Sequence, residues 1–306
     1  MTEVLSVVSG SANRGLAAAV ADHLGIEPAG CDPVRFPDGE LRPCVDNVCG
    51  ADVYVIQPTS PPVNDHVVEL LLLLDACRRS RAARVTAVVP YFGYARQDRR
   101  TAAGQPLGST VIAQAIVVAG ADRLVVVDPH TPAFEALLAV PVETLTAVPA
   151  LCGELAGQRP QRPLVVAPDL GAVKLADRYG TLLGAPVAVV RKHRESGASV
   201  SALDLVGDVG SRTVVIVDDM ITTGGTIEAA VGLLRERGAA GEILVAATHG
   251  LFVHAAVNRL RDLELGRIVV TDTVAPKQAG SVIEVCSIAP ILAAAIARMH
   301  EDEPVA

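Results

Sequence analysis

Tryptophan is absent from this sequence of 306 residues, which also contains only four tyrosines and four phenylalanines. Proteins that bind single-stranded nucleic acid usually stack bases on aromatic side chains, so this shortage argues against that class. The charge balance, 26 Lys and Arg against 34 Asp and Glu, gives a net charge of −8 at pH 7. It argues against a duplex-binding surface, which needs clustered positive charge. A pocket for a small phosphorylated substrate needs only local charge and remains possible.

The six cysteines form no CxxC pair and no Cys/His cluster with zinc-finger spacing. We therefore expect reduced thiols, mostly buried. No apolar run approaches the roughly 18 residues that a membrane crossing needs. The first ten residues also lack the basic and apolar stretches of a secretion signal. We expect a soluble protein of the cytoplasm.

Half of the residues are hydrophobic and the mean hydropathy is +0.40, so the chain can bury a large core. At about 150 residues per domain, the length favours two domains. Short apolar runs alternate with helical patterns, which indicates βαβ units and an α/β fold with mainly parallel sheets flanked by helices. The expected strands are 53–57, 84–89, 124–127, 164–167, 187–190, 213–217, 243–248 and 267–271, and the clearest helices are 65–79, 108–119, 225–237 and 252–262.

The best candidate for a domain boundary is the poorly patterned, proline-interrupted stretch 143–163. A weak repeat crosses it, because 123–131 resembles 212–226: each has a strand pattern, then acidic residues, then a loop. We therefore predict two tandem domains of one type, residues 1–145 and 146–306. Coincidence between two ordinary α/β strands is the alternative explanation of the repeat.

The sharpest local pattern is VVIVDDMITTGGTI at residues 214–227. We expect a buried strand that ends at two carboxylates, Asp218 and Asp219, followed by a turn and a helix. Ligands bind at the carboxyl ends of strands in open α/β sheets. The free N–H groups of such a turn and of a helix N-terminus suit a phosphate. The carboxylates could hold sugar hydroxyls, directly or through Mg²⁺.

The turn itself has the composition of a phosphate site. Gly224 and Gly225 let the backbone come close to a ligand, and hydroxyl donors come from Thr222, Thr223 and Thr226. The alternative is an ordinary strand-to-helix turn in which Asp and Thr only cap the helix. Two acids directly ahead of TTGGT argue against that alternative.

This stretch resembles the ribose-5-phosphate loop of type I phosphoribosyltransferases and of ribose-phosphate diphosphokinases (PRPP synthetases). FPDGE at 36–40 and PYFGYARQDR at 90–99 resemble the ATP-binding segments of the diphosphokinases, which the transferases do not carry. The resemblance continues in collinear order along almost the whole chain. Its other motifs are GSANRGLA, NDHVVELLLLLDACRRS, DPH at 128–130, APDLGAVK at 167–174, KHR at 192–194 and ATHGLF at 247–252.

The resemblance implies two phosphoribosyltransferase-like domains, the first of them degenerate. It implies a reaction in which the β,γ-diphosphoryl group of ATP passes to the C1 hydroxyl of ribose 5-phosphate, giving phosphoribosyl diphosphate and AMP. Mg²⁺ is the implied cofactor. Hexamers built from dimers are implied too, with each ATP site completed by the FPDGE loop of a neighbouring subunit.

The resemblance also assigns site residues. Phe36 would stack on adenine, and the other nucleotide-binding residues would be Asp38, Gly39, Glu40, Arg96, Gln97 and Asp98. Ribose 5-phosphate would lie against Arg194, Asp218, Asp219, Thr222, Thr223, Gly224, Gly225 and Thr226. The transferred diphosphate would lie in a loop with Asp169, Gly171 and Lys174, and His130 and Asp169 would be the metal-associated pair.

Lys192 and Arg194 are the implied catalytic residues. They follow a predicted strand and lead into the Glu-Ser-Gly-Ala-Ser stretch, which has the composition of a mobile loop. Diphosphoryl transfer needs positioning and positive charge more than covalent help from the protein. A Lys and an Arg on a closing loop would supply that charge. The alternative is a pair of surface basic residues after a strand.

Several positions depart from the family pattern. Pro129 replaces a Leu in the DLH pattern, and Leu170 and Ala172 lie in a segment usually richer in Gly. Thr222 stands where many members have Asp. In a stretch otherwise like ENVRG, Asn47 and Cys49 replace a Ser and an Arg of phosphate-activated members. Allosteric control by phosphate and ADP is therefore not expected, unless a basic residue such as Arg42 or Arg100 holds the anion.

Two other functions remain open at this point. A phosphoribosyltransferase would share VDDMITTGGT, but it would leave FPDGE, YARQDR and the second domain unexplained. A non-catalytic regulatory homologue would be consistent with the departures at Pro129 and Leu170. The intact Lys192, Arg194 and Asp218 argue against it.

Overall fold

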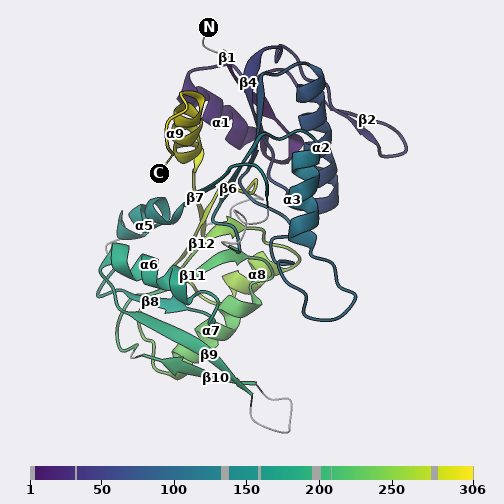
Figure 1. The fold of residues 1–306 in the computed structure, drawn as a ribbon. Coiled ribbons are helices and arrows are strands. Elements are labelled where there is room, and N and C mark those ends of the chain that lie inside the picture. The colour runs from purple at the N-terminus through teal and green to yellow at the C-terminus, as the bar shows by residue number, and fades with distance from the viewer. Residues whose placement is uncertain are drawn as a thin grey trace. The chain divides into compact units, whose positions relative to one another are not determined.

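The computed structural model describes residues 4–31, 33–131, 138–157, 160–194, 201–207, 209–276 and 282–305, and the backbone alone for 192–194 and 201–203. The chain divides into two compact units (Figure 1). Unit 1 contains Met1–Thr146, Thr273–Ala275 and Ser287–Ala306, and unit 2 contains Ala147–Asp272 and Pro276–Cys286. Each unit has its own sheet with helices on both faces, so the predicted α/β fold is confirmed.

Unit 1 is built on a sheet in the order β1-β4-β5-β6-β7, with every neighbouring pair parallel. Its strands are β1 (Val4–Ser9), β4 (Ala51–Ile56), β5 (Arg84–Val89), β6 (Arg123–Val127) and β7 (Val142–Leu145). Its helices are η1 (Ser11–Asn13), α1 (Arg14–Leu24), α2 (Val63–Arg79), α3 (Gly108–Val118) and α9 (Ala289–His300). A small antiparallel hairpin joins β2 (Val34–Arg35) and β3 (Leu41–Arg42). All six residues of β4 are buried, including the charged Asp52, as expected of a strand covered on both faces.

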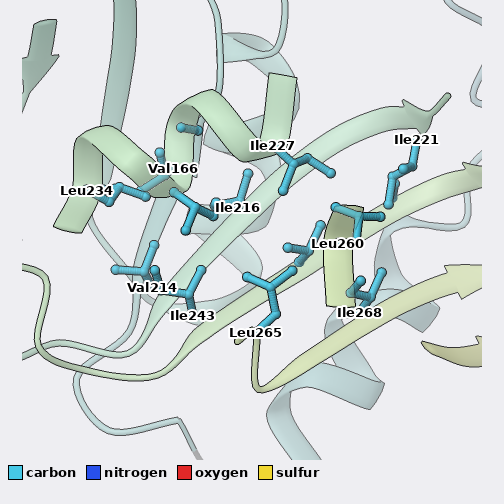
Figure 2. Packing of buried hydrophobic residues seen from close by; sticks show 14 of the residues in the cluster. Val166, Val214, Ile216, Ile221, Ile227, Leu234, Ile243, Leu260, Leu265 and Ile268 are labelled. Atoms are coloured by element: carbon cyan, nitrogen blue, oxygen red, sulfur yellow. The ribbon is translucent and has the colours of Figure 1, made fainter. Parts of the chain in front are cut away.

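The sheet of unit 2 has the order β10-β9-β8-β11-β12-β13-β14, parallel except for the edge strand β10. Its strands are β8 (Leu164–Ala167), β9 (Val187–Arg194), β10 (Ser201–Val206), β11 (Val214–Ile221), β12 (Ile243–Gly250), β13 (Arg267–Thr271) and β14 (Ile283–Cys286). Its helices are α5 (Val148–Gly157), α6 (Val173–Leu183), α7 (Gly225–Glu236) and α8 (Ala256–Arg261). Figure 2 shows the aliphatic core between this sheet and α7 and α8, where Ile216 and Leu234 meet.

The C-terminal helix belongs to unit 1, although the predicted second domain runs to residue 306. Helix α9 packs against α1, and its last turn reaches β4 through His300, whose Nδ1 lies 2.9 Å from an Asp52 oxygen. The sequence has an apolar helical pattern at 288–300, but nothing in that pattern indicates which part of the fold it packs against. The domain limits 1–145 and 146–306, and the role given to each domain, stay predictions.

The thiols are less buried than expected. Cys77 and Cys152 are buried, but Cys44 and Cys49 are exposed because they lie in the irregular segment between β3 and β4. The expectation of mostly buried cysteines is therefore wrong. None of the helices in the described ranges combines the length and the apolar character that a membrane crossing requires.

Candidate active site

Strand β11 carries the main functional pattern at the centre of the unit 2 sheet, between β8 and β12. The sequence predicts that this strand ends at the two carboxylates, but its pairing with β12 continues to Ile221. That prediction is wrong because Met220 and Ile221, both buried, extend the apolar run past them. Asp218 and Asp219 therefore lie inside the strand, half-buried near its carboxyl end.

The 222–226 loop joins β11 to α7, and the carbonyl groups that lead into it are bound by one neighbouring segment. The Ile221 oxygen accepts from the N–H groups of Leu251 (3.0 Å) and Phe252 (3.1 Å), and the Thr222 oxygen accepts from that of Val253 (3.0 Å). Gly224 has φ 77° and ψ 0°, a left-handed conformation that favours glycine. The loop is thus tightly held on its carbonyl side.

The N–H side of the same loop is open. In the part of the chain that the structure describes, the backbone N–H groups of residues 223–226 have no hydrogen-bond partner. None of the side chains that the structure describes caps α7. Free N–H groups at a helix N-terminus carry the positive end of the helix dipole. This end of α7 is therefore suited to a phosphate or another anion.

The turn that leads into α1 in unit 1 shows the opposite arrangement. Glu69 accepts from the N–H of Ser11 (2.8 Å), and Gln57 accepts from the N–H of Ala12 (3.0 Å). Asn13 caps the helix with its side chain. Because the protein's own side chains satisfy these donors, this helix start offers much less to an anion than that of α7 does.

Two adjacent carboxylates dominate the electrostatics beside the 222–226 loop. Burial, the negative charge of Asp219 and, to a smaller extent, that of Asp169 together raise the pKa of Asp218 to about 8. The N–H of Asp219 donates to Asp218 Oδ1 at 2.9 Å. A concentration of carboxylate oxygens of this kind suits sugar hydroxyls or a divalent cation.

The predicted diphosphate loop follows β8, the strand next to β11. Asp169 Oδ1 accepts from the N–H groups of Gly171 (2.8 Å) and Ala172 (3.2 Å), which folds the loop into a tight turn. Leu170 is 64 % exposed, so this departure from the family composition does not fill the core. Lys174 is exposed in the first turn of α6. Asp169 therefore follows the strand next to β11, and its negative charge helps to raise the pKa of Asp218.

Lys192 and Arg194 lie at the end of β9, which is longer than the predicted strand 187–190. The strand continues because β10 pairs with it in an antiparallel register that places Leu203 opposite Lys192 and Ser201 opposite Arg194. The Glu-Ser-Gly-Ala-Ser stretch at 195–199 lies outside the described residues, as do the side chains of Lys192 and Arg194. Their catalytic role stays a prediction.

In unit 1, FPDGE forms the tip of the β2–β3 hairpin, which projects away from the sheet (Figure 1). The N–H of Phe36 donates to the backbone carbonyl oxygen of Glu40 at 2.8 Å, and the Glu40 N–H donates to Asp38 Oδ1 at 3.1 Å. Gly39 closes the turn with φ 96°. The Arg42 guanidinium carbon lies 5.1 Å from the centre of the Phe36 ring. One face of the ring is therefore covered by a cation.

The second nucleotide-binding segment, 90–99, turns at the carboxyl end of β5. Gln97 is exposed, but its side-chain oxygen lies over Gly108, only 2.4 Å from where a Cβ would stand. Arg96 is exposed. Hydrogen bonds from Arg99 lower the pKa of Asp98, which is therefore charged at neutral pH. Nucleotide binding by Arg96, Gln97 and Asp98 stays a prediction.

Two residues that belong to none of the predicted sites hold this segment. The Thr59 hydroxyl accepts from the N–H of Gly93 at 2.6 Å, and the hydroxyl of Tyr94, which has φ 65°, donates to Asn64. Asp65, next to Asn64, pairs with Arg35 of the hairpin at 3.4 Å. Both predicted nucleotide segments are thus anchored on the first turn of α2. Only tertiary contacts reveal this role.

The predicted metal residues belong to different units, His130 to unit 1 and Asp169 to unit 2. His130 is exposed and follows Asp128, which has φ 36°. Over the described ranges, no three His, Cys, Asp or Glu side chains gather closely enough to hold a metal ion alone. Mg²⁺ is typically held by one or two carboxylates together with substrate phosphates. The carboxylate oxygens of Asp169, Asp218 and Asp219 are ligands of this type.

The chain is similar to known proteins along almost its whole length. Residues 5–120 match the N-terminal domain of ribose phosphate pyrophosphokinase, and residues 187–306 match the phosphoribosyl synthetase-associated domain. The ribose-phosphate pyrophosphokinase of Gloeobacter violaceus is 39 % identical over 99 % of this chain and 92 % of its own length. That of Staphylococcus saprophyticus is 37 % identical over 98 % of this chain and 95 % of its own length.

A solved structure extends the similarity from sequence to fold. The crystal structure of phosphoribosylpyrophosphate synthetase from Mycobacterium smegmatis matches with a TM-score of 0.92 and 35 % identity. The match covers 98 % of this chain and 100 % of that one. Two matched domains, full-length relatives and the open loop after β11 lead to one conclusion. The chain belongs to the ribose-phosphate pyrophosphokinase family.

Proposed function

We propose that this chain is a ribose-phosphate diphosphokinase, which transfers the β,γ-diphosphoryl group of ATP to the C1 hydroxyl of ribose 5-phosphate. The products are 5-phosphoribosyl 1-diphosphate and AMP. The names of the full-length relatives support this reaction. Within the chain, one observation carries the proposal: the free N–H groups at the start of α7 lie directly after the carboxylates of Asp218 and Asp219.

In this proposal the 222–226 loop binds the 5-phosphate. The N–H groups of residues 223–226 and the hydroxyl groups of Thr222, Thr223 and Thr226 donate to its oxygens. Asp218 and Asp219 accept hydrogen bonds from the ribose hydroxyls, which fixes the orientation of the sugar. The C1 hydroxyl is thereby held toward the diphosphate loop.

The chemical step is a displacement at the β-phosphorus of ATP. The C1 oxygen forms a bond to that phosphorus, and the bond from the phosphorus to the α,β-bridging oxygen breaks. AMP leaves with the electron pair of that bond, and the C1 hydroxyl releases its proton. Catalysis of such a step rests on in-line positioning and on positive charge where negative charge grows. Lys192 and Arg194 supply that charge, while Gly171 and Lys174 hold the transferred diphosphate.

Mg²⁺ bound with ATP would neutralise part of the phosphate charge. The family resemblance gives His130 and Asp169 as the residues that hold it, and the carboxylates of Asp218 and Asp219 suit a cation that also touches the sugar hydroxyls. In this proposal, these four residues orient the charged phosphate groups and limit the repulsion between them.

The nucleotide binds to segments of unit 1. Phe36 stacks on adenine, Asp38 and Glu40 accept from its amino group, and Arg96, Gln97 and Asp98 contact the rest of the nucleotide. The projecting hairpin supports a homo-oligomer in which Phe36 and its neighbours reach the site of another subunit. The resemblance extends this to a cytoplasmic hexamer.

An assay of AMP formation from ATP, with and without ribose 5-phosphate, tests the proposal. We expect AMP to appear only when ribose 5-phosphate and Mg²⁺ are both present, in equal amount to phosphoribosyl diphosphate. A phosphoribosyltransferase would instead consume phosphoribosyl diphosphate without forming AMP from ATP. A regulatory homologue would form neither product on its own. Either result would overturn the proposal.

A further inference from the structure

Arg259 of α8 is a charged residue that makes specific contacts with the 222–226 loop. Its Nη1 donates to the Thr223 carbonyl oxygen at 2.9 Å, and its Nε lies 3.1 Å from Glu228 Oε2 in the first turn of α7. The same Nη1 lies 3.7 Å from where a Cβ on Gly225 would stand. One guanidinium therefore joins the loop, the start of α7 and α8.

This contact completes a series of hydrogen bonds along the loop. The carbonyl oxygens of Ile221 and Thr222 are bound by backbone N–H groups of residues 251–253, and the next one, that of Thr223, is bound by Arg259. Arg259 is therefore the only side chain that donates in this series among the described residues. Over the described ranges, no backbone N–H donates to the Thr223 carbonyl oxygen, so none could replace Arg259 there.

The geometry of the peptide bond links this contact to the phosphate side of the loop. In a trans peptide the carbonyl of one residue and the N–H of the next point in opposite directions. When Arg259 holds the Thr223 oxygen on the α8 side, the N–H of Gly224 points away from α8. That N–H is one of the free donors at the start of α7.

The neighbouring residue of α8 supports the same loop by packing. Leu260 is 1 % exposed, and a Cβ on Gly224 would stand 3.2 Å from its side chain. Figure 2 shows Leu260 in the buried cluster that also contains Ile221 and Ile227, which flank the loop. Packing by Leu260 fixes where the loop lies, and Arg259 fixes how the Thr223–Gly224 peptide is turned.

We propose that Arg259 is a positioning residue for the ribose-phosphate substrate, which acts by orienting the Thr223–Gly224 peptide so that its N–H faces the 5-phosphate. This inference rests on the proposed function. Its second contact, with Glu228, also offsets a negative charge beside the phosphate. Side chains of the Arg259–Glu228 pair are 40 % and 50 % exposed, so the pair adds little to stability.

The test compares Arg259→Gln with Arg261→Gln and Glu228→Gln. Arg261 is an exposed arginine of the same helix with no side-chain contact in the described residues. We expect Arg259→Gln to raise the KM for ribose 5-phosphate about tenfold, with the KM for ATP and the Tm little changed. Arg261→Gln should leave all of them unchanged. Glu228→Gln should leave the KM for ribose 5-phosphate unchanged or lower it, because it removes only the ion pair.

Arg259→Lys tests whether the planar guanidinium group is needed or a positive charge is enough. This variant should recover part of the affinity for ribose 5-phosphate that Arg259→Gln loses. Titration calorimetry with ribose 5-phosphate alone gives a readout that does not depend on turnover. Equal affinity in Arg259→Gln and the unchanged protein would overturn the inference, as would a parallel loss for ATP and a lower Tm. Absence of AMP formation in the unchanged protein would overturn the proposed function instead, whatever the calorimetry shows.

Discussion

The buried carboxylate of Asp52 accepts two hydrogen bonds from the Arg84 guanidinium, one from Nε at 2.8 Å and one from Nη2 at 2.6 Å. The two residues face each other at the start of β4 and β5. Tyr54 donates to the same carboxylate at 3.1 Å, and His300 of α9 lies 2.9 Å from it. The carboxylate of Asp52 thus links α9, near the C-terminus, to β4 in the sheet of unit 1.

Asp52→Asn should destabilise the protein by about 3 kcal/mol, since it removes the buried partner of Arg84 and leaves that charge only its exposed pair with Asp302 at 2.8 Å. Urea unfolding followed by circular dichroism measures the shift of the midpoint. Arg79→Ala, which breaks the exposed Arg79–Asp75 pair, is the matched control and should not move it. Equal midpoints for Asp52→Asn and the unchanged protein would contradict the prediction.

The same carboxylate should make stability depend on acid pH. Burial alone would raise the pKa of Asp52, but hydrogen bonds from Arg84 and His300 outweigh burial, so its pKa lies below the ordinary value of 3.8. A carboxyl with a lowered folded pKa stabilises the protein above its unfolded pKa, and this contribution is lost as the pH falls through the folded value. We expect the urea midpoint to fall as the pH drops from about 5 to below 3, and less steeply in Asp52→Asn. Parallel curves for the two proteins would show that Asp52 is not the group that titrates.

Some of this architecture could be predicted from the sequence. The apolar runs gave the parallel strands, and the two glycines of TTGGT marked the turn into α7 correctly. The strand ends were less predictable, because cross-strand pairing extends β9 to Arg194 and β11 to Ile221 through polar residues. The contact between Arg259 and Thr223 could not be predicted from the sequence, since no local pattern distinguishes Arg259 from Arg261.

Asp218→Asn and Thr226→Val should weaken the binding of ribose 5-phosphate and leave ATP binding nearly intact. The reason is that the 222–226 loop presents N–H groups to a phosphate, while the predicted nucleotide segments lie in unit 1. Separate calorimetric titrations with each substrate measure the two affinities. Loss of ATP binding with unchanged ribose 5-phosphate binding would mean that the two sites have been assigned the wrong way round.

Lys192→Ala should lower kcat by about 10²-fold or more, because loss of one electrostatic donor to a developing charge costs about 2.7–4 kcal/mol. Both KM values should change far less, since the interaction forms mainly in the transition state. Steady-state kinetics with each substrate varied in turn measure these quantities. Arg191→Ala is the control, because Arg191 precedes Lys192 in β9 and has no proposed role. An unchanged kcat with a higher KM for ribose 5-phosphate would refute the catalytic role.

Inorganic phosphate should not be needed for activity. In the family pattern, an anion site would place an Arg where this chain has Cys49 and a Ser where it has Asn47. Both residues are exposed, so neither is needed for packing. A thiol offers one weak donor and no charge. Losing a charge-assisted contact should lower effector affinity by about 1.5–3 kcal/mol, roughly ten- to a hundredfold.

Initial rates measured from zero phosphate upward decide this prediction, together with the type of inhibition by ADP. We expect a flat response to phosphate and ADP inhibition that is simply competitive with ATP. Cys49→Arg combined with Asn47→Ser should introduce a response to phosphate if the site is otherwise intact. A sigmoidal activation curve in the unchanged protein would contradict the prediction and would mean that another cation holds the anion. Arg42 and Arg100, which are both exposed, would be the first to test.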